Sequence, residues 1–268
     1  MVHQNWTYQL NPFAVANFYY QLRVKTTRVN MPIFFLYRSR ASYSDGCCGQ
    51  NKNLTIIGFY NEMHQNRVYE RIDHKYLERG HTYLENDRDF AQKEKRKKTA
   101  TVYLLQDWVE AVRDSNVTKP FETTAMQQED FLDWIGFVNE RYKMATKDQE
   151  GKRVLLRDIH WLNFGWGEEK EAGNISMKHH PDEVWVRFSL SEDEPWKKLK
   201  IVRPGQTTTG QSIPQELYQG QVLLKTAKVR DLQKIAAQFV PPLQRTFYFE
   251  LKDNGSEDGN STDEDPVK

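Results

Sequence analysis

Two aspartates, Asp45 and Asp87, have the surroundings that metal-assisted chemistry needs. Asp45 follows an apolar, aromatic segment, residues 31–43, which is typical of a buried strand, and Gly46 comes next. In α/β folds, ligands bind at the carboxyl ends of such strands. Two carboxylates that lie close together repel each other unless a cation joins them, and Mg²⁺ prefers carboxylate, phosphate and water oxygens. From spacing alone, a turn at Asp45 and a helix N-cap at Asp87 explain the two positions equally well.

The elements around these aspartates determine whether the two side chains can meet. Apolar positions at helical spacing predict a helix over residues 54–68, and a short strand follows at 69–79. A helix over 85–98 begins with acids and ends with Lys and Arg, which suits the helix dipole. The order strand, Asp45, helix, strand, acidic helix can therefore place Asp45 beside Asp87.

The pattern changes after Thr118-Lys119-Pro120, which is the best internal boundary. Before it, a short strand and helix are expected at 101–112. Beyond it, we expect a small α+β module. Its expected elements are helices at 128–143 and 229–239, the second ended by Pro241-Pro242, strands at 154–164 and 183–190, and a loop at 203–210. The predicted domains are therefore residues 1–117, 118–252 and an acidic tail, 253–268.

One sequence block resembles a known family. Ser44-Asp45-Gly46-Cys47 runs into Gly49-Gln50-Asn51-Lys52-Asn53, and Gly80-His81-Thr82 and Asp87 follow. The block resembles transposon-derived, transposase-like proteins of animal genomes, which are similar to DDE-type transposases and integrases. The resemblance covers residues 8–120 well and continues more loosely to Pro241-Pro242. It implies an α/β fold with an RNase H-like core, here incomplete.

The resemblance also implies roles for individual residues. Asp45 matches the second acid of the catalytic triad, Asp87 is our choice for the third and Glu94 is its rival. Asp45 and Asp87 would hold Mg²⁺ or Mn²⁺, and His81 would orient a carboxylate or a phosphate. The family's first acid has no counterpart, because no Asp or Glu precedes Asp45. We therefore expect a truncated or decayed copy, or an incomplete gene model, with impaired cleavage and strand transfer.

A basic run near the end of the predicted helix 85–98 is the best candidate for contact with DNA. A run of this kind can pair with phosphates, and its contribution to binding falls steeply with salt. A solvated helix face or a localisation signal is the plainer interpretation. Aromatic residues of the second module, such as Trp161 and Trp196, could stack on unpaired bases, although packing is their more common role. The candidate nucleic-acid contacts are Lys93, Lys95, Arg96, Lys97 and Lys98, together with Lys52 in the motif.

Composition excludes several classes of protein. Of the 268 residues, 13% are aromatic, which argues against wholesale disorder. No apolar stretch approaches the roughly 18–20 residues that cross a bilayer, and the start lacks an apolar signal region, so we expect a nuclear or cytoplasmic protein that is not secreted. The only cysteines, Cys47 and Cys48, are adjacent, so a disulfide framework is not expected.

The charge is unevenly distributed. The tail holds six acids and one lysine, so the rest of the chain holds 37 basic and 31 acidic residues, a net charge of +6. The tail composition predicts disorder, with either a solvating role or competition with DNA for the basic body.

Three hypotheses for the function follow from the sequence: a transposase relative that binds and cleaves DNA, a scaffold that binds DNA or protein without catalysis, and a second module that binds an unidentified protein. A homo-oligomer is possible.

Overall fold

The computed structural model consists of two compact units, each assembled from two separate stretches of chain. The first comprises the described residues of Met1–Leu84 and Glu129–Leu217, and the second those of Glu85–Gln128 and Tyr218–Lys268. The residues that the structure describes are 39–48, 50–66, 68–78, 85–123, 126–165, 169–171, 174–176, 180–206 and 214–256.

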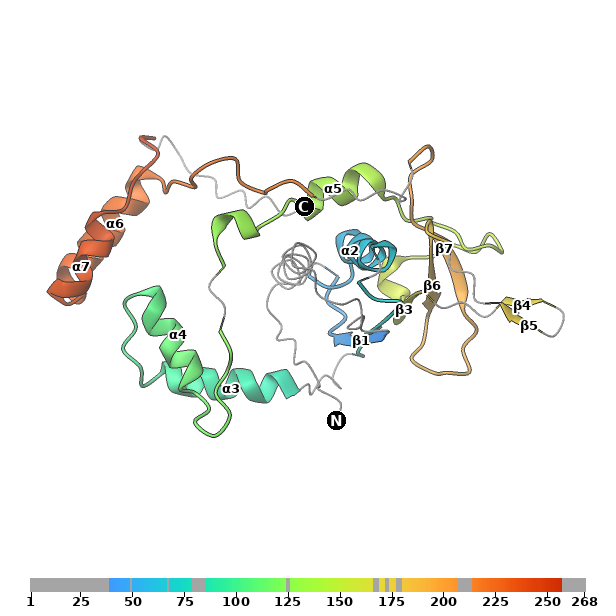
Figure 1. Cartoon of the computed structure of the whole chain (residues 1–268), viewed down its shortest axis with the longest axis horizontal. Helices are drawn as coiled ribbons and strands as arrows, with labels where there is room; N and C mark the ends of the chain where they lie inside the picture. Colours follow the sequence, from blue (N-terminus) through green and yellow to red (C-terminus); the bar gives the residue numbers. More distant parts are fainter. Residues whose placement is uncertain are drawn as a thin grey trace, which may run out of the picture. The chain divides into compact units, whose positions relative to one another are not determined.

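The first unit contains a mixed five-stranded sheet in the order β1-β2-β3-β6-β7 (Figure 1). β1 and β2 are parallel, and each later neighbour in this order is antiparallel. β4 and β5 form a separate two-stranded sheet. The predicted α/β class is therefore confirmed. The strands are β1 Ser39–Ser44, β2 Arg71–Tyr76, β3 Trp161–Phe164, β4 Glu169–Glu171, β5 Asn174–Ser176, β6 Glu183–Arg187 and β7 Lys197–Lys200.

Six α-helices complete the described part of the chain. Helix α2 begins where the sequence predicts, because the Asn53 side chain accepts a hydrogen bond from the Ile56 N–H at 2.9 Å. Asp133 caps α5 in the same way, accepting from the Gly136 N–H at 2.8 Å. The helices are α2 Leu54–Gln65, α3 Glu85–Lys97, α4 Leu105–Arg113, α5 Trp134–Arg141, α6 Thr226–Phe239 and α7 Pro242–Phe249.

Several predicted elements are shorter than expected or were missed. Residues 154–164 contain a 3-10 turn at Leu156–Asp158 before β3, and 128–143 contain another at Gln128–Asp130 before α5. Pro242 begins α7, since proline is well suited to the first helical position, where its missing N–H costs nothing. Strand β7 was not predicted. Of the predicted strand 31–43, residues 39–43 lie in β1 and the others lie outside the described residues.

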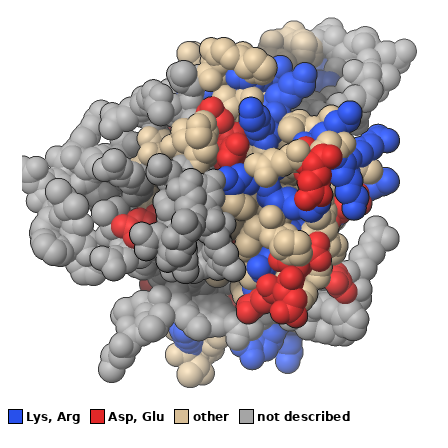
Figure 2. All heavy atoms as spheres, turned by 90° about the vertical axis from the view of Figure 1, so that its right-hand side faces the viewer, with Lys and Arg blue, Asp and Glu red and all other residues tan. Residues whose placement is uncertain are grey.

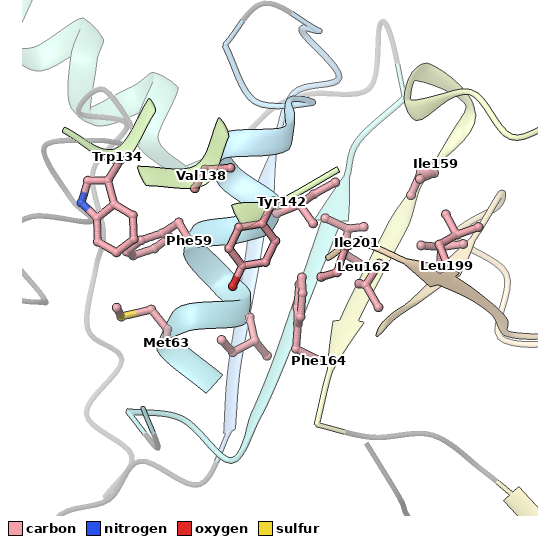
Figure 3. Packing of buried hydrophobic residues seen from close by; sticks show 14 of the residues in the cluster. Phe59, Met63, Trp134, Val138, Tyr142, Ile159, Leu162, Phe164, Leu199 and Ile201 are labelled. Atoms are coloured by element: carbon pink, nitrogen blue, oxygen red, sulfur yellow. The ribbon is translucent and has the colours of Figure 1, made fainter. Parts of the chain in front are cut away.

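The core of the first unit forms between α2, α5 and one face of the sheet (Figure 3). Gly58 lets the two helices approach closely, because a Cβ there would lie 2.7 Å from a Val138 methyl carbon and 3.2 Å from the Tyr142 ring. Tyr142 is fully buried, and its hydroxyl donates to Glu62 Oε1 at 2.8 Å. Burial raises the pKa of the Glu62 carboxyl.

The sheet crosses the predicted boundary between residues 117 and 118. β3, from the predicted second module, pairs with β2, from the predicted first domain. Strand pairing therefore joins segments on either side of residue 117 that are about 90 residues apart in the sequence, since Asp73 pairs with Asn163. The predicted tail disorder does not hold for its first residues, since Asp253 forms a bridge with Leu224. Residues 257–268 lie outside the described residues.

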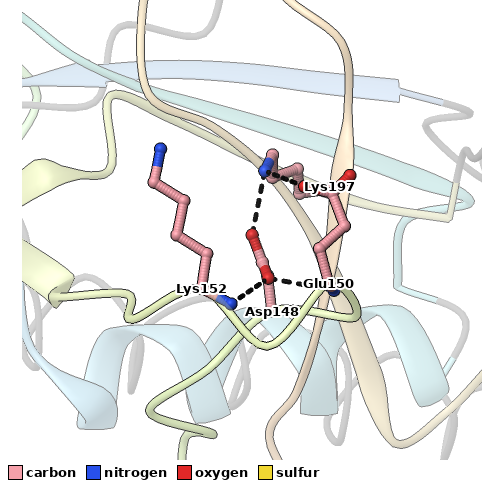
Figure 4. A network of polar contacts seen from close by, with 4 residues as sticks. All are labelled: Asp148, Glu150, Lys152 and Lys197. Carbon is pink, nitrogen blue, oxygen red and sulfur yellow. Dashed lines mark hydrogen bonds and ion pairs between the residues drawn. The ribbon is translucent and has the colours of Figure 1, made fainter.

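A buried ion pair fastens β7 to the loop that follows α5 (Figure 4). Lys197 Nζ lies 2.9 Å from Asp148 Oδ2 and 3.2 Å from Glu150 Oε2. The backbone N–H groups of Glu150 and Lys152 donate to Asp148 Oδ1, and the Asp148 side chain is only 2% exposed. The hydrogen bond from Lys197 holds the pKa of the Asp148 carboxyl below its ordinary value.

We expect Asp148→Asn to lower the free energy of unfolding at pH 7. A carboxyl whose pKa is lower in the folded state stabilises the fold above its unfolded pKa, about 3.9, and loses this contribution as pH falls through the folded value. Urea unfolding from pH 7 down to pH 3 should therefore show a wild-type advantage that shrinks toward acid. Glu150→Gln, at a side chain that is 76% exposed, is the control and should change little. An Asp148 effect that stays constant with pH would contradict this account.

Candidate carboxylate site and nucleic-acid interface

The loop after β1 is organised around one backbone carbonyl. The Cys47 C=O accepts hydrogen bonds from the N–H groups of Gln50, Asn51 and Lys52, at 3.3, 2.8 and 3.0 Å. The chain therefore turns sharply between the end of β1 and Asn53, the N-cap of α2. Cys47 and Cys48 are exposed free thiols on this turn.

Asp45 lies at the carboxyl end of β1, as predicted, and half of its carboxylate is engaged. Oδ1 accepts from Asn51 Nδ2 at 2.6 Å and from the Cys47 N–H at 3.1 Å. No hydrogen bond or ion pair to Oδ2 occurs within the described ranges. We call the loop between β1 and α2 the motif loop, because it carries the sequence block described above. Asp45 therefore organises the motif loop through one carboxylate oxygen and leaves the other oxygen available to a ligand.

Lys52 is buried in this structure and does not face solvent as a phosphate contact would. Its exposed fraction is 5%, and its Nζ donates to the Arg157 carbonyl at 2.8 Å. The ammonium also lies 5.0 Å from the centre of the Tyr76 ring, and the Tyr76 hydroxyl donates to the Asn51 carbonyl at 3.1 Å. Burial lowers the pKa of the Lys52 ammonium. Lys52 thus joins the motif loop to the segment before β3.

A buried histidine that the sequence did not single out supports the end of β1. Ser44 Oγ donates to the Asp45 carbonyl at 3.0 Å and lies 3.0 Å from His74 Nε2. Because the Ser44 hydroxyl has only one proton, Nε2 carries the proton of the His74 ring. Nδ1 then accepts from Ser42 Oγ at 2.7 Å or Tyr60 Oη at 3.0 Å. Burial lowers the pKa of His74 to about 3, so the ring is neutral at pH 7 and holds the backbone at Asp45 in place.

The described residues beside Asp45 do not by themselves form a metal-binding group, and the predicted metal site shared with Asp87 stays a prediction. Within the described parts of the chain, no three His, Cys, Asp or Glu side chains are grouped closely enough to hold a metal ion. A Cβ built on Gly46 would lie 3.9 Å from Lys52 Nζ, so a cationic group lies beside the motif loop and opposes a divalent cation. Two-metal cleavage needs both ions held by several carboxylates, and the described residues here supply one free oxygen.

The other proposed acids belong to the second unit. Asp87 is exposed in the first turn of α3, and Glu94 is exposed further along the same helix, where it lies 3.5 Å from Lys97 Nζ. The predicted convergence of Asp45 and Asp87 stays a prediction, as does the choice between Asp87 and Glu94. His81 lies outside the described residues.

The carboxyl end of α3 presents the predicted basic run to solvent. Lys95, Arg96, Lys97 and Lys98 are all exposed. Among the residues that the structure describes, only weak ion pairs partly neutralise them: Arg96 lies 4.0 Å from the Asp114 carboxylate, and Lys97 pairs with Glu94. We call these four residues the α3 basic end. Lys93 differs, because it is half-buried and its ammonium lies 4.3 Å from the centre of the Phe121 ring.

Comparison with known proteins gives one match. Residues 43–152 match the family model described as Domain of unknown function (DUF7869). The matched range begins just before Asp45 and includes the motif loop, α2, β2 and the α3 basic end. No curated protein and no solved structure matches the chain. None of the helices in the described ranges is both long and apolar enough to cross a bilayer.

Proposed function

We propose that the chain is a DNA-binding relative of DDE-type transposases, with an incomplete RNase H-like core and impaired phosphodiester cleavage. The α3 basic end carries the DNA-binding part of the proposal. Four consecutive exposed cations on the last turn of a helix and just beyond it create a local positive field. Such a field attracts phosphates, and the release of their counterions on binding favours the complex.

A generally basic surface is not what supports the proposal. The face drawn in Figure 2 carries Lys and Arg together with groups of Asp and Glu among its described residues. The net charge of the whole chain is only +1. Binding is therefore expected to depend on particular clusters rather than on total charge.

The impaired-cleavage part of the proposal rests on the surroundings of Asp45. One free carboxylate oxygen, with the Lys52 ammonium close to the motif loop, is a poor substitute for the carboxylate set that two Mg²⁺ ions require. In this proposal, Asp45 organises the loop between β1 and α2 and performs no cleavage step.

One experiment tests both parts. The purified full chain is titrated into a fluorescein-labelled DNA duplex, and the same protein is incubated with supercoiled plasmid in Mg²⁺ and in Mn²⁺. We expect salt-sensitive binding without nicking. Absence of duplex binding would overturn the proposed function. Metal-dependent nicking that disappears in Asp45→Ala would show instead that cleavage is intact.

A further inference from the structure

A row of alternating aromatic and cationic side chains crosses the five-stranded sheet. The register places Tyr43 beside Lys75, Lys75 beside Trp161, and Trp161 beside Arg187. Continuing the β6–β7 ladder by one pair places Arg187 opposite Trp196, and the guanidinium carbon lies 4.3 Å from the centre of that ring. We call these five side chains the cross-strand row.

The row lies on the sheet face away from α2. His74 contacts Tyr60 of α2, and side chains alternate between the two faces along a strand, so Lys75 points to the opposite face. Tyr43, two residues before Asp45, stands at one end of the row and is 50% exposed. The row therefore begins beside the candidate carboxylate site.

The central ring of the row is locked in position. Trp161 Nε1 donates to Asp73 Oδ1 at 2.9 Å, and Asn163 Nδ2 donates to the same oxygen at 2.8 Å. The Trp161 ring in turn fixes two cations, since Lys75 Nζ lies 3.6 Å and the Arg187 guanidinium carbon 5.0 Å from its centre. Such contacts hold a cation without neutralising its charge.

Neither cation has an anionic partner in the described part of the chain. Lys75 and Arg187 are both half-buried, and neither forms an ion pair or a hydrogen bond through its side chain there. Arg187 Nε is buried and has no hydrogen-bond partner among the described residues. The nearby Asp73 is already paired with Arg71. A half-buried cation without a counterion is unfavourable, so this arrangement is suited to an external anion.

We propose that the cross-strand row binds single-stranded DNA, with backbone phosphates against Lys75 and Arg187 and an unpaired base stacked on Tyr43. Lys75 and Arg187 belong to strands that are two positions apart in the sheet, about 10 Å between backbones, and the guanidinium fork suits phosphate oxygens. An exposed aromatic ring beside cations is what an unpaired base can stack on, whereas a duplex keeps its bases stacked inside. This inference rests on the proposed function and adds a second, strand-selective surface to it.

The test compares single-stranded and duplex DNA on the full chain. Labelled oligothymidine of about 20 nucleotides, longer than a typical aromatic-lined site, and a duplex of the same length are titrated by fluorescence anisotropy. At 0.1 M salt, Lys75→Gln/Arg187→Gln should weaken single-strand binding about 25-fold, from two lost phosphate contacts on a single strand. Tyr43→Leu should weaken it at least about fivefold. Duplex binding should change less than about threefold, because the α3 basic end carries it.

Two further variants make the result decisive. Lys143→Gln/Lys147→Gln removes the same charge from exposed positions elsewhere in the first unit and should change single-strand binding about twofold or less. Lys75→Arg/Arg187→Lys keeps both charges and should retain most of the single-strand affinity. A variant that failed to fold would lose this affinity.

The outcomes separate the two proposals. Single-strand affinity that falls no further in the Lys75→Gln/Arg187→Gln variant than in the control would overturn this inference, while duplex binding through the α3 basic end would leave the proposed function standing. A chain that binds neither form of DNA would overturn both.

Discussion

Neutralising the α3 basic end, as Lys95→Gln/Arg96→Gln/Lys97→Gln/Lys98→Gln, is expected to weaken binding to duplex DNA about 10³-fold at 0.1 M salt. Each phosphate contact contributes a slope of about 0.9 in log affinity against log salt, so four contacts are together worth roughly three to four decades relative to 1 M salt. The four side chains are exposed and the helix continues through most of them, so glutamine should leave the fold unchanged. Fluorescence anisotropy with a labelled duplex measures the loss.

The matched control removes four charges from elsewhere in the second unit. Lys225→Gln/Lys228→Gln/Arg230→Gln/Lys234→Gln changes the net charge equally on and just before α6, where these four residues are also exposed. We expect this control to weaken binding at most about tenfold, through the long-range field alone. Equal losses in the two variants would show that total charge governs binding and that the α3 basic end has no special role.

Phe164→Ala is expected to destabilise the first unit by about 3–5 kcal/mol, because it removes a large buried ring and leaves a cavity. Phe164 is fully buried at the end of β3, and its ring centre lies 6.1 Å from that of Tyr60. A loss of this size is a large part of the total stability of a typical domain. Urea unfolding, followed by tryptophan fluorescence, measures it.

The control for this prediction is the same substitution at an exposed phenylalanine. Phe239, the last residue of α6, is 69% exposed, and Phe239→Ala should change the free energy of unfolding by less than about 0.5 kcal/mol. If both variants unfold at the same urea concentration, β3 does not lie in a packed core.

Local signals in the sequence predicted the elements that local interactions determine. Helix α2 has its cap at Asn53 and its apolar spacing in one short stretch, and α3 carries its charge order within one helix. The end of β1 just before Asp45 followed from the turn residues there. These elements position the acids that were proposed for the site: Asp45 directly follows β1, and Asp87 and Glu94 lie on α3.

The remaining features depend on partners that are distant in the sequence. β7 reads Lys-Lys-Leu-Lys, which has little apolar content, and it is a strand because it pairs with β6. Lys52 was predicted to contact DNA, but its ammonium binds the Arg157 carbonyl, 105 residues away. His74 lies between Ile72 and Tyr76 in a strand, so its spacing indicated burial but could not indicate that two serines of β1 would hold its ring. Such contacts depend on strand register, which no local pattern specifies.

The most direct test of the account is the salt dependence of duplex binding by the wild-type chain. Affinity is measured between about 0.05 and 0.3 M salt, and log affinity is plotted against log salt concentration. If the α3 basic end contacts phosphates through its four cations, the slope should be about −3.6 or steeper. A slope near zero, or no measurable binding at the lowest salt concentration, would contradict the proposal that this protein binds DNA.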